Sequence, residues 1–172
     1  MRTFGLGLAL AALLSACGPS GDSKGQAPSA EARHVDACAL IADPSALFGA
    51  GAEAIDSPGY DAMAGVCQWQ SADGRRGGDL IIYTAASLGA VAAPAQLATL
   101  TESWDATTET PLEALEGIGD EAQLATDLPG YQAQIAFRKG DIVVAIAARS
   151  GDPAINDVVL ATRMAQAAAG GL

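Results

Sequence analysis

The chain is poor in the residue types that most catalytic and nucleic-acid sites need. Its 172 residues hold one histidine, and 9 Lys or Arg stand against 20 Asp or Glu, a net charge of −11. The single His34 lies beside a Gly- and Ser-rich segment, which argues against a Ser-His-Asp triad and excludes a two-histidine metal site. The acidic excess argues against nucleic acid and anionic membrane surfaces as partners, because both require basic patches.

The sequence also has no apolar run long enough for a permanent membrane helix. The run Phe4–Leu14 is about half of the ~20 residues that a spanning helix needs. Arg2 precedes it and small residues follow it, the plan of a cleaved export signal. We therefore expect residues 1–16 to be a signal peptide that is removed from the mature chain.

The end of this signal, Leu14-Ser15-Ala16-Cys17, resembles the bacterial lipobox. The resemblance implies that Cys17 is acylated with diacylglycerol and palmitate, and that the protein is a lipoprotein anchored in the cell envelope, outside the cytoplasm. Residue 18 is Gly rather than Asp, which resembles cargo of the outer membrane, facing the periplasm, if the source has two membranes. The alternative is an ordinary secretory signal cut near Ala16, which would leave Cys17 as a free thiol.

Cysteine is scarce, and its assignment is simple once Cys17 is given to lipid. Cys38 and Cys67 remain, an even pair in an exported protein, so we expect a disulfide between them. Closing a loop of about 30 residues would stabilise the fold by roughly 3–4 kcal/mol. Two cysteines and one histidine fall one ligand short of a tetrahedral metal site.

Composition divides the mature chain into a tether and one domain. Residues 17–34 hold the lipidation cysteine and a segment rich in Gly, Ser, Pro and Ala, typical of a flexible linker. Residues 35–172 have the length of a normal single domain. We expect this domain to carry whatever the protein binds.

Periodicity and capping signals predict three main helices and five strands in the domain. Asp43-Pro44 and Asp152-Pro153 each combine an N-cap acceptor with a proline at the first helical position. Residues 49–65 are expected to be irregular, and Pro111–Leu115 to form one helical turn. The helices are expected from residue 44 to 49, 92 to 103 and 154 to 169, and the strands over 66–70, 80–84, 118–126 and the two arms of 131–148.

The last two strands form the clearest predicted hairpin. On the first arm Tyr131, Ala133, Ile135 and Phe137 alternate with Gln132, Gln134, Ala136 and Arg138, and a two-residue turn at Lys139-Gly140 would pair Phe137 with Ile142. The same register would place Arg138 opposite Asp141. The sequence thus predicts a single-domain α+β fold in the order α-β-β-α-β-β-β-α, an antiparallel sheet of about five strands with its helices packed on one face.

Three local motifs resemble a group of small bacterial envelope lipoproteins, best known from actinobacteria, whose domain has no assigned function. The motifs are Cys38–Pro44, Cys67-Gln68-Trp69 and Gly117–Ala122. The resemblance would cover about residues 36–168. It implies an α+β fold with a Cys38–Cys67 bridge, and it brings no catalytic residue.

Few side chains qualify as candidate contacts. Trp104 closes a predicted helix and could be an exposed partner anchor. Arg75 and Arg76 form a cationic pair in a predicted loop, where they could meet an acidic or phosphate-bearing surface or could simply be solvated. Trp69 lies beside Cys67 and is expected in the core.

These observations favour a non-enzymatic lipoprotein that presents a small binding domain to an envelope protein, with no cofactor, metal or nucleic acid. A carrier of a small apolar ligand or lipid is the alternative, and it requires an apolar cavity under residues 91–100 or under the last helix. A carboxylate enzyme is a second alternative. It requires two carboxylates to converge in one cleft, from the set Asp120, Glu121, Asp127 and Asp141.

Overall fold

The computed structural model describes residues 35–56, 63–87, 89, 91–128, 131–152 and 154–172. The predicted signal peptide and tether, with Cys17, lie outside the described residues. Three α-helices, a short 3-10 helix η1 and seven strands occur in the described part of the chain. Their bounds are η1 Cys38–Leu40, α1 Pro44–Phe48, β1 Glu53–Asp56, β2 Gly65–Gln70, β3 Gly77–Thr84, α2 Ala93–Asp105, β4 Glu113–Ala114, β5 Glu121–Leu128, β6 Tyr131–Lys139, β7 Ile142–Arg149 and α3 Asp157–Gly171.

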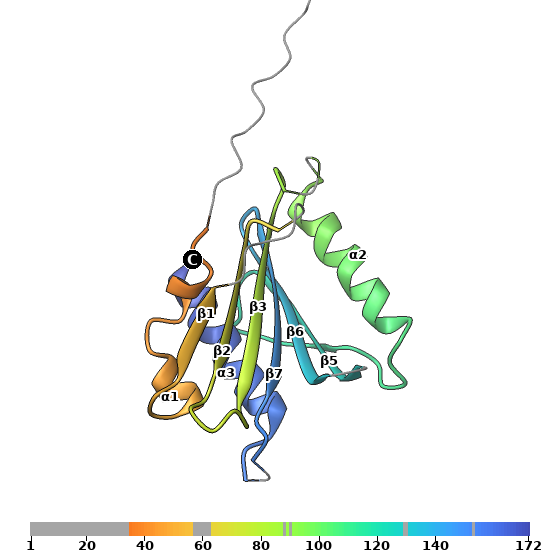
Figure 1. Ribbon diagram of the computed structural model, residues 1–172. Helices are drawn as coiled ribbons and strands as arrows, with labels where there is room; N and C mark the ends of the chain where they lie inside the picture. The colour runs from red at the N-terminus through yellow and green to blue at the C-terminus, as the bar shows by residue number, and fades with distance from the viewer. Residues whose placement is uncertain (1–34, 57–62, 88, 90, 129–130, 153) are drawn as a thin grey trace, which may run out of the picture.

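The strands form one antiparallel sheet in the order β1-β2-β3-β7-β6-β5-β4 (Figure 1). The α+β class is confirmed, but the expected count of about five strands is wrong by the two edge strands. β1 lies where the sequence predicted irregular structure, and β4 replaces the helical turn predicted at residues 111–115. Each pairs with a single neighbour, so hydrogen bonds to that neighbour define it rather than its own apolar alternation.

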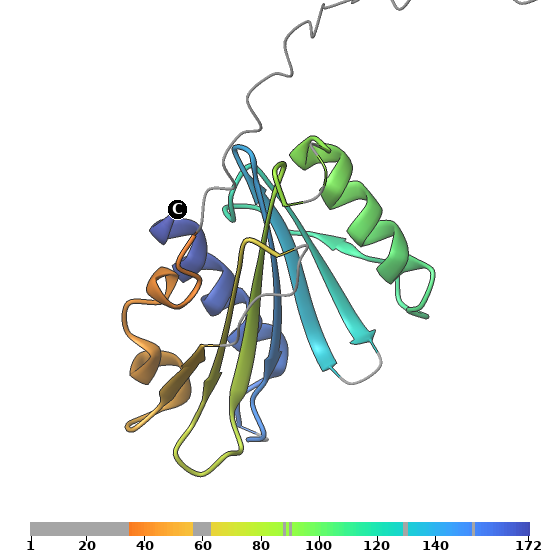
Figure 2. The same ribbon diagram turned by 45° about the horizontal axis from the view of Figure 1, so that its top comes forward.

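The helices cover both faces of the sheet, not one as predicted. α3 packs against β6 and β7 together with η1 and α1, whereas α2 packs on β5, β6 and β7 from the opposite side (Figures 1 and 2). The cause is visible in β7, where all residues from Ile142 to Ala148 are buried. A strand with apolar residues on both faces needs cover on both faces.

The larger core lies between the sheet and α3. Large side chains from the middle strands, including Leu80, Ile135, Phe137 and Ile146, are 0 or 1% exposed there, and Met164 of α3 is 0% exposed. Lys139 also reaches this side, and its Nζ donates to the carbonyl of Ala169 at the end of α3 (2.6 Å). This face therefore holds most of the large buried apolar side chains described in the domain.

The predicted hairpin β6–β7 is correct in its faces but wrong in its register. Phe137 pairs with Val144 and Lys139 with Ile142, so the turn is Gly140-Asp141 rather than Lys139-Gly140. Gly140 takes φ +61°, and a left-handed first turn residue is the position that favours glycine in a type II′ hairpin. Because the shift is two residues, every side chain keeps its face.

The same shift changes the partner of Arg138. Its Nη1 donates to Asp120 Oδ2 at 2.7 Å rather than meeting Asp141. The Asp120 carboxylate also accepts from the backbone N–H of Gly140 (2.9 Å). Asp120 therefore ties the residues before β5 to the β6–β7 turn.

α3 begins three residues later than predicted. Asn156 is its N-cap, with the side-chain oxygen accepting from the N–H of Val158 (2.7 Å). Asp152 instead accepts from the N–H of Ala154 (2.9 Å) in the turn before the helix. Both residues are good N-cap formers, so local propensity alone could not choose between them.

Candidate functional site

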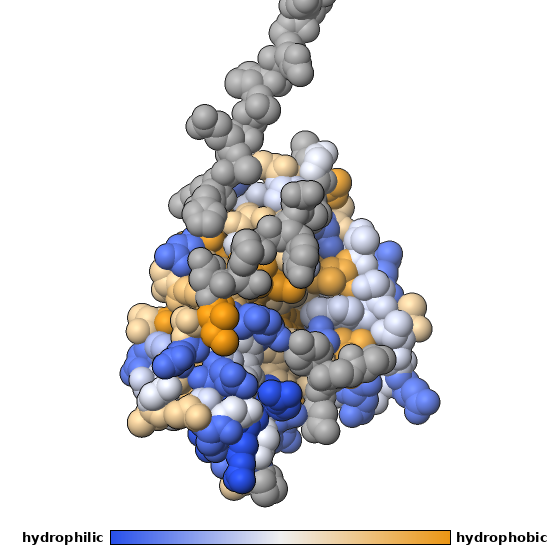
Figure 3. Space-filling view, in the orientation of Figure 1, coloured by the Kyte–Doolittle hydropathy of each residue, from blue (hydrophilic) through white to orange (hydrophobic). Residues whose placement is uncertain are grey.

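An open apolar pocket lies between α2 and the β3–β7 pair, and it is the best candidate binding site. Its volume is about 370 Å³, within the range of small-molecule sites. Figure 3 shows apolar side chains gathered in the middle of this face of the molecule. The lining residues are Tyr83, Val91, Gln96, Thr99, Leu100, Ser103 and Val143.

The helix contributes its lining residues at helical spacing. Gln96, Thr99, Leu100 and Ser103 stand at i, i+3, i+4 and i+7, so they share one stripe of α2. A neighbouring stripe with Ala93, Leu97 and Trp104 is buried in the second core against β5, β6 and β7. α2 thus packs on the β5–β6–β7 half of the sheet, and the residues that line the pocket lie on its side toward β3.

Strand alternation places the sheet side of the pocket. Tyr83 of β3 and Val143 of β7 are direct cross-strand partners and share the α2 face. The next pair along the same face is Ile81 and Ala145, so the β7 side chain at this position is a single methyl group. Of these four residues, Tyr83 and Val143 line the pocket.

Gln96 is the polar group that defines the pocket. The residue is 5% exposed, and its Nε2 donates to the carbonyls of Val91 (2.6 Å) and Thr84 (3.4 Å). Its Oε1 is buried without a hydrogen-bond partner. A buried acceptor without a donor is destabilising, and the described residues leave this oxygen without one.

Tyr83 adds the second polar group. Burial raises the pKa of its phenol above the ordinary value of 10.0, so the hydroxyl is neutral at physiological pH. The lining side chains carry no charge near pH 7, and the described wall therefore suits an uncharged group.

A second hollow lies at the other end of the same sheet face. Its volume is about 240 Å³, and its more polar walls include Ile55, Gln68, Asp79 and Arg149. Gln68 Nε2 donates to Asp79 Oδ1 at 2.8 Å. Ile55 is 49% exposed, so an apolar side chain stands at the rim of a polar depression.

The predicted cysteine pair is bonded. A disulfide joins Cys38 of η1 to Cys67 of β2, across 29 residues of sequence. Trp69, two residues later on the same face, is 2% exposed and stacks on Phe48 with ring centroids 6.3 Å apart. Trp69 is therefore part of the core that the disulfide closes, as the sequence predicted.

Trp104 is not an exposed anchor. Its side chain is 8% exposed and packs in the second core, next to Leu97 and the β5–β6 strands. The sequence correctly placed Trp104 at the end of a helix. This helix covers the second face of the sheet, and Trp104 lies on its buried side. The expectation that Trp104 is an exposed anchor is therefore wrong.

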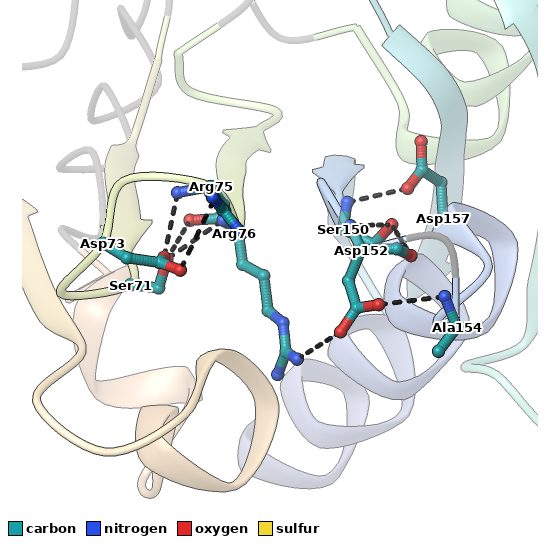
Figure 4. Close-up of polar contacts among 8 residues, drawn as sticks. All are labelled: Ser71, Asp73, Arg75, Arg76, Ser150, Asp152, Ala154 and Asp157. Atoms are coloured by element: carbon teal, nitrogen blue, oxygen red, sulfur yellow. Dashed lines mark hydrogen bonds and ion pairs between the residues drawn. The ribbon is translucent and has the colours of Figure 1, made fainter.

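Arg75 and Arg76 do not act as a pair (Figure 4). The Arg76 Nη2 lies 2.9 Å from Asp152 Oδ2, which joins the β2–β3 turn to the segment before α3. Arg75 is 77% exposed and lies 4.0 Å from Asp73. Only Arg75 therefore presents an open cation at this loop.

The carboxylates in Figure 4 are held by donors. The Asp152 pKa is lowered below 3.8 first by the N–H of Ala154 and then by Arg76. The Asp73 pKa is lowered first by the hydroxyl of Ser71 (2.6 Å) and then by the N–H of Arg75. Both carboxylates are ionised at neutral pH and serve the loop geometry.

The four carboxylates of the enzyme alternative do not share any of the three described pockets. Asp120 is engaged with Arg138 and with the β6–β7 turn that contains Asp141. Glu121 opens β5, whereas Asp127 lies near the other end of that strand with φ +62°. None of these four carboxylates lines any of the three described pockets.

Two further observations concern the described part of the chain. It contains no group of three or more His, Cys, Asp or Glu side chains placed to hold a metal ion. None of its helices is long and apolar enough to cross a membrane. Comparison of the sequence with protein-family models and curated proteins, and of the chain with solved structures, gave no match.

The residues that sequence reasoning missed are Tyr83 and Gln96. Tyr83 reads as an ordinary strand residue, and Gln96 as a polar position on a helix surface. One signal was present: Gln96 directly precedes Leu97, and Val91–Leu100 was the segment under which an apolar cavity was expected. The polar atom at that cavity was not foreseen.

Proposed function

We propose that this protein is a lipid-anchored, non-enzymatic lipoprotein of the bacterial cell envelope that presents its 35–172 domain as a binding module at a membrane surface. One observation carries the proposal. Leu14-Ser15-Ala16-Cys17 stands at the end of an 11-residue apolar run, Phe4–Leu14, that a single arginine precedes, the arrangement of a lipobox. Permanent anchoring takes more than one acyl chain, and a cysteine modified in this way carries several.

Features of the described domain support a presenting role. Its first helical turn is bonded to the sheet through Cys38 and Cys67, which suits an oxidising compartment. The second hollow on the α2 side of the sheet and the pocket beside α2 are both available for a partner. The outer membrane is the favoured site if the source has two membranes.

The direct test is Cys17→Ser in the full chain, with Ser20→Ala as the matched control in the same segment. The natural chain and the control are expected to incorporate labelled palmitate and to sediment with membranes. Cys17→Ser is expected to lose the label and to enter the soluble exported fraction. Equal labelling or equal membrane retention of Cys17→Ser would contradict the lipid anchor.

A carrier of a small apolar ligand is the second candidate function, and the α2 pocket favours it. The pocket lies beneath Val91 and Leu100, whereas the core under α3 is packed with buried side chains. A lipoprotein that presents such a pocket next to a membrane could exchange ligand with that membrane. Native mass spectrometry of the protein extracted without detergent tests this, because a carrier retains a small molecule of defined mass.

A further inference from the structure

The second hollow, at the other end of the sheet face from the α2 pocket, has glycine backbone at its floor. Gly77 and Gly78 begin β3. Gly78 faces α3, because a Cβ there would meet Met164, so Gly77 faces the hollow. A Cβ at Gly77 would lie 3.2 Å from the carbonyl oxygen of Trp69. The absent side chain therefore leaves the backbone of β2 and β3 open to the hollow.

Arg149 lies across this floor. It is the direct cross-strand partner of Gly77, and its Nη2 lies 3.9 Å from the place where a Cβ of Gly77 would be. Arg149 is exposed, and none of the described residues forms an ion pair with it. Because a guanidinium presents its N–H groups as a planar fork, it matches a carboxylate through two parallel hydrogen bonds.

Asp79 supplies the opposite charge in the same hollow. It accepts from Gln68 Nε2 at 2.8 Å, and because a carboxylate has about four acceptor positions, a ligand N–H can join the donors already there. Asp79 follows Gly77 by two residues on β3, a spacing of about 6–7 Å along a strand. The guanidinium over Gly77 and the Asp79 carboxylate thus flank a space of about one ligand residue.

The two charges narrow the ligand that the hollow fits. A simple anion would meet Asp79 and the net charge of −11, and a simple cation would lie beside Arg149. A carboxylate with an N–H donor a few bonds away satisfies both residues. The volume of about 240 Å³ is below the range of about 300–1,000 Å³ for sites that enclose a whole drug-sized molecule. The hollow therefore suits the end of a chain.

We propose that the second hollow binds the C-terminal end of a peptide. The terminal carboxylate pairs with Arg149, and the N–H of the last residue donates to Asp79. A small apolar side chain of the peptide lies against Ile55, which is 49% exposed at the rim. Capture of a terminal carboxylate is a recurrent mode of peptide recognition. This inference rests on the proposed binding role of the domain, and it names the chemistry of the partner.

Titration of the purified full chain with N-acetyl-dialanine tests the proposal, with nitrogen–proton correlation NMR spectra as the readout. We expect the backbone amide signals of residues 68–70 and 77–79 to shift. We expect N-acetyl-dialanine amide, which has no carboxylate, to bind at least about tenfold more weakly. The ester analogue, in which oxygen replaces the N–H of the last residue, should also bind about tenfold more weakly.

Two arginine variants test where the carboxylate binds. Arg149→Gln removes the charge over Gly77, and Arg75→Gln removes the same charge from a neighbouring exposed residue that does not line the hollow. We expect Arg149→Gln to weaken binding of the acid at least about tenfold and to abolish its advantage over the amide. We expect Arg75→Gln to change binding by less than about twofold, since salt screens exposed charges.

Asp79→Asn tests the hydrogen bond from the last N–H. The asparagine side chain adds a donor where the natural chain has only acceptors, so we expect the ester analogue to bind as well as N-acetyl-dialanine. If this variant does not fold, the comparison of the two compounds in the natural chain decides the same point.

Several results would overturn the proposal. They are the absence of shifts at about 10 mM peptide, tenfold above a millimolar Kd, equal binding of the acid and its amide, or equal losses in Arg149→Gln and Arg75→Gln. None of these bears on the lipid anchor, which the Cys17→Ser experiment decides. A chain that lacks the anchor but prefers the acid over the amide would separate the two conclusions.

Discussion

The two faces of the sheet are built from the same strands but differ in the size of their side chains. Toward α3, β7 presents Ile142, Val144 and Ile146, and toward α2 it presents Val143, Ala145 and Ala147. Large residues on the first face fill the space up to α3. The second face has smaller β7 side chains, and beside α2 it carries an open pocket of about 370 Å³.

The two faces also differ in the helices that cover them and in their covalent cross-links. η1, α1 and α3 all lie on the first face, and the Cys38–Cys67 disulfide closes it. On the second face α2 is the one helix among the described residues, and it packs mainly on β5, β6 and β7. The first face therefore carries most of the stability, and the second face can change its side chains at lower cost, which suits a binding surface.

Truncating one side chain on each face gives the largest expected contrast. Phe137→Ala removes a ring that is 0% exposed on the α3 face and should lower the free energy of unfolding by about 3–5 kcal/mol. Leu100→Ala removes a half-buried side chain at the pocket and should cost roughly 1 kcal/mol. Urea unfolding of both variants measures the difference. Equal losses would show that the two faces contribute alike.

Removing the disulfide is the next largest change. The double variant Cys38→Ala, Cys67→Ala frees a segment with a sequence separation of 29 residues, and the loss should be about 3–4 kcal/mol in the chain-entropy model. Unfolding by urea and counting of thiols in the denatured, unreduced natural chain check this together. Free thiols in the denatured natural chain would contradict the bond.

The paired arginines of the β2–β3 turn give a smaller contrast. Arg76→Ala breaks the 2.9 Å contact with Asp152 and should shift the urea midpoint down slightly, because such partly exposed pairs contribute little. Arg75→Ala removes a side chain that is 77% exposed and should leave the midpoint unchanged. A larger effect for Arg75 would reverse the roles assigned to the two residues.

The smallest predicted effect is a dependence on acid. Asp73 and Asp152 have a pKa lowered below 3.8 in the folded protein. The stabilisation that they provide is therefore complete above their unfolded-state pKa, and it is lost as the pH falls through the lower folded-state pKa. Urea unfolding between pH 7 and pH 3 should show a decline below about pH 4–5. The variant Asp73→Asn, Asp152→Asn should decline less steeply over that range.

The sequence was informative wherever a residue pattern is decided by its own neighbours. Alternation in β6 and β7 predicted which residues share a face, and the cysteine count predicted the Cys38–Cys67 bond. Turn chemistry decided the register: Gly140 takes the left-handed position, and Arg138 pairs with Asp120 rather than with Asp141. A left-handed position needs glycine, whereas an exposed ion pair contributes little.

The sequence did not predict a helix on the second face of the sheet, because the residues that decide this are spread along the chain. The uninterrupted apolar run Ile142–Ala148 is the signature of a strand covered on both sides, whereas the prediction placed the helices on one face of the sheet. The pocket depends on how α2 packs beside Tyr83 of β3 and Val143 of β7, and packing between segments far apart in the sequence leaves no local signal. Gln96 has its meaning only through that packing.

The Cys38–Cys67 bond also determines how the domain would respond to mechanical load. A pull on the chain ahead of Val35 reaches Cys38 within three residues and passes through the covalent bond into β2, a strand that is hydrogen-bonded on both sides by β1 and β3. The force would then have to shear a strand out of the sheet before it could peel α3 from its face. If the protein were attached to a membrane through its first residues, the sheet face under α2 would thus keep its shape under tension.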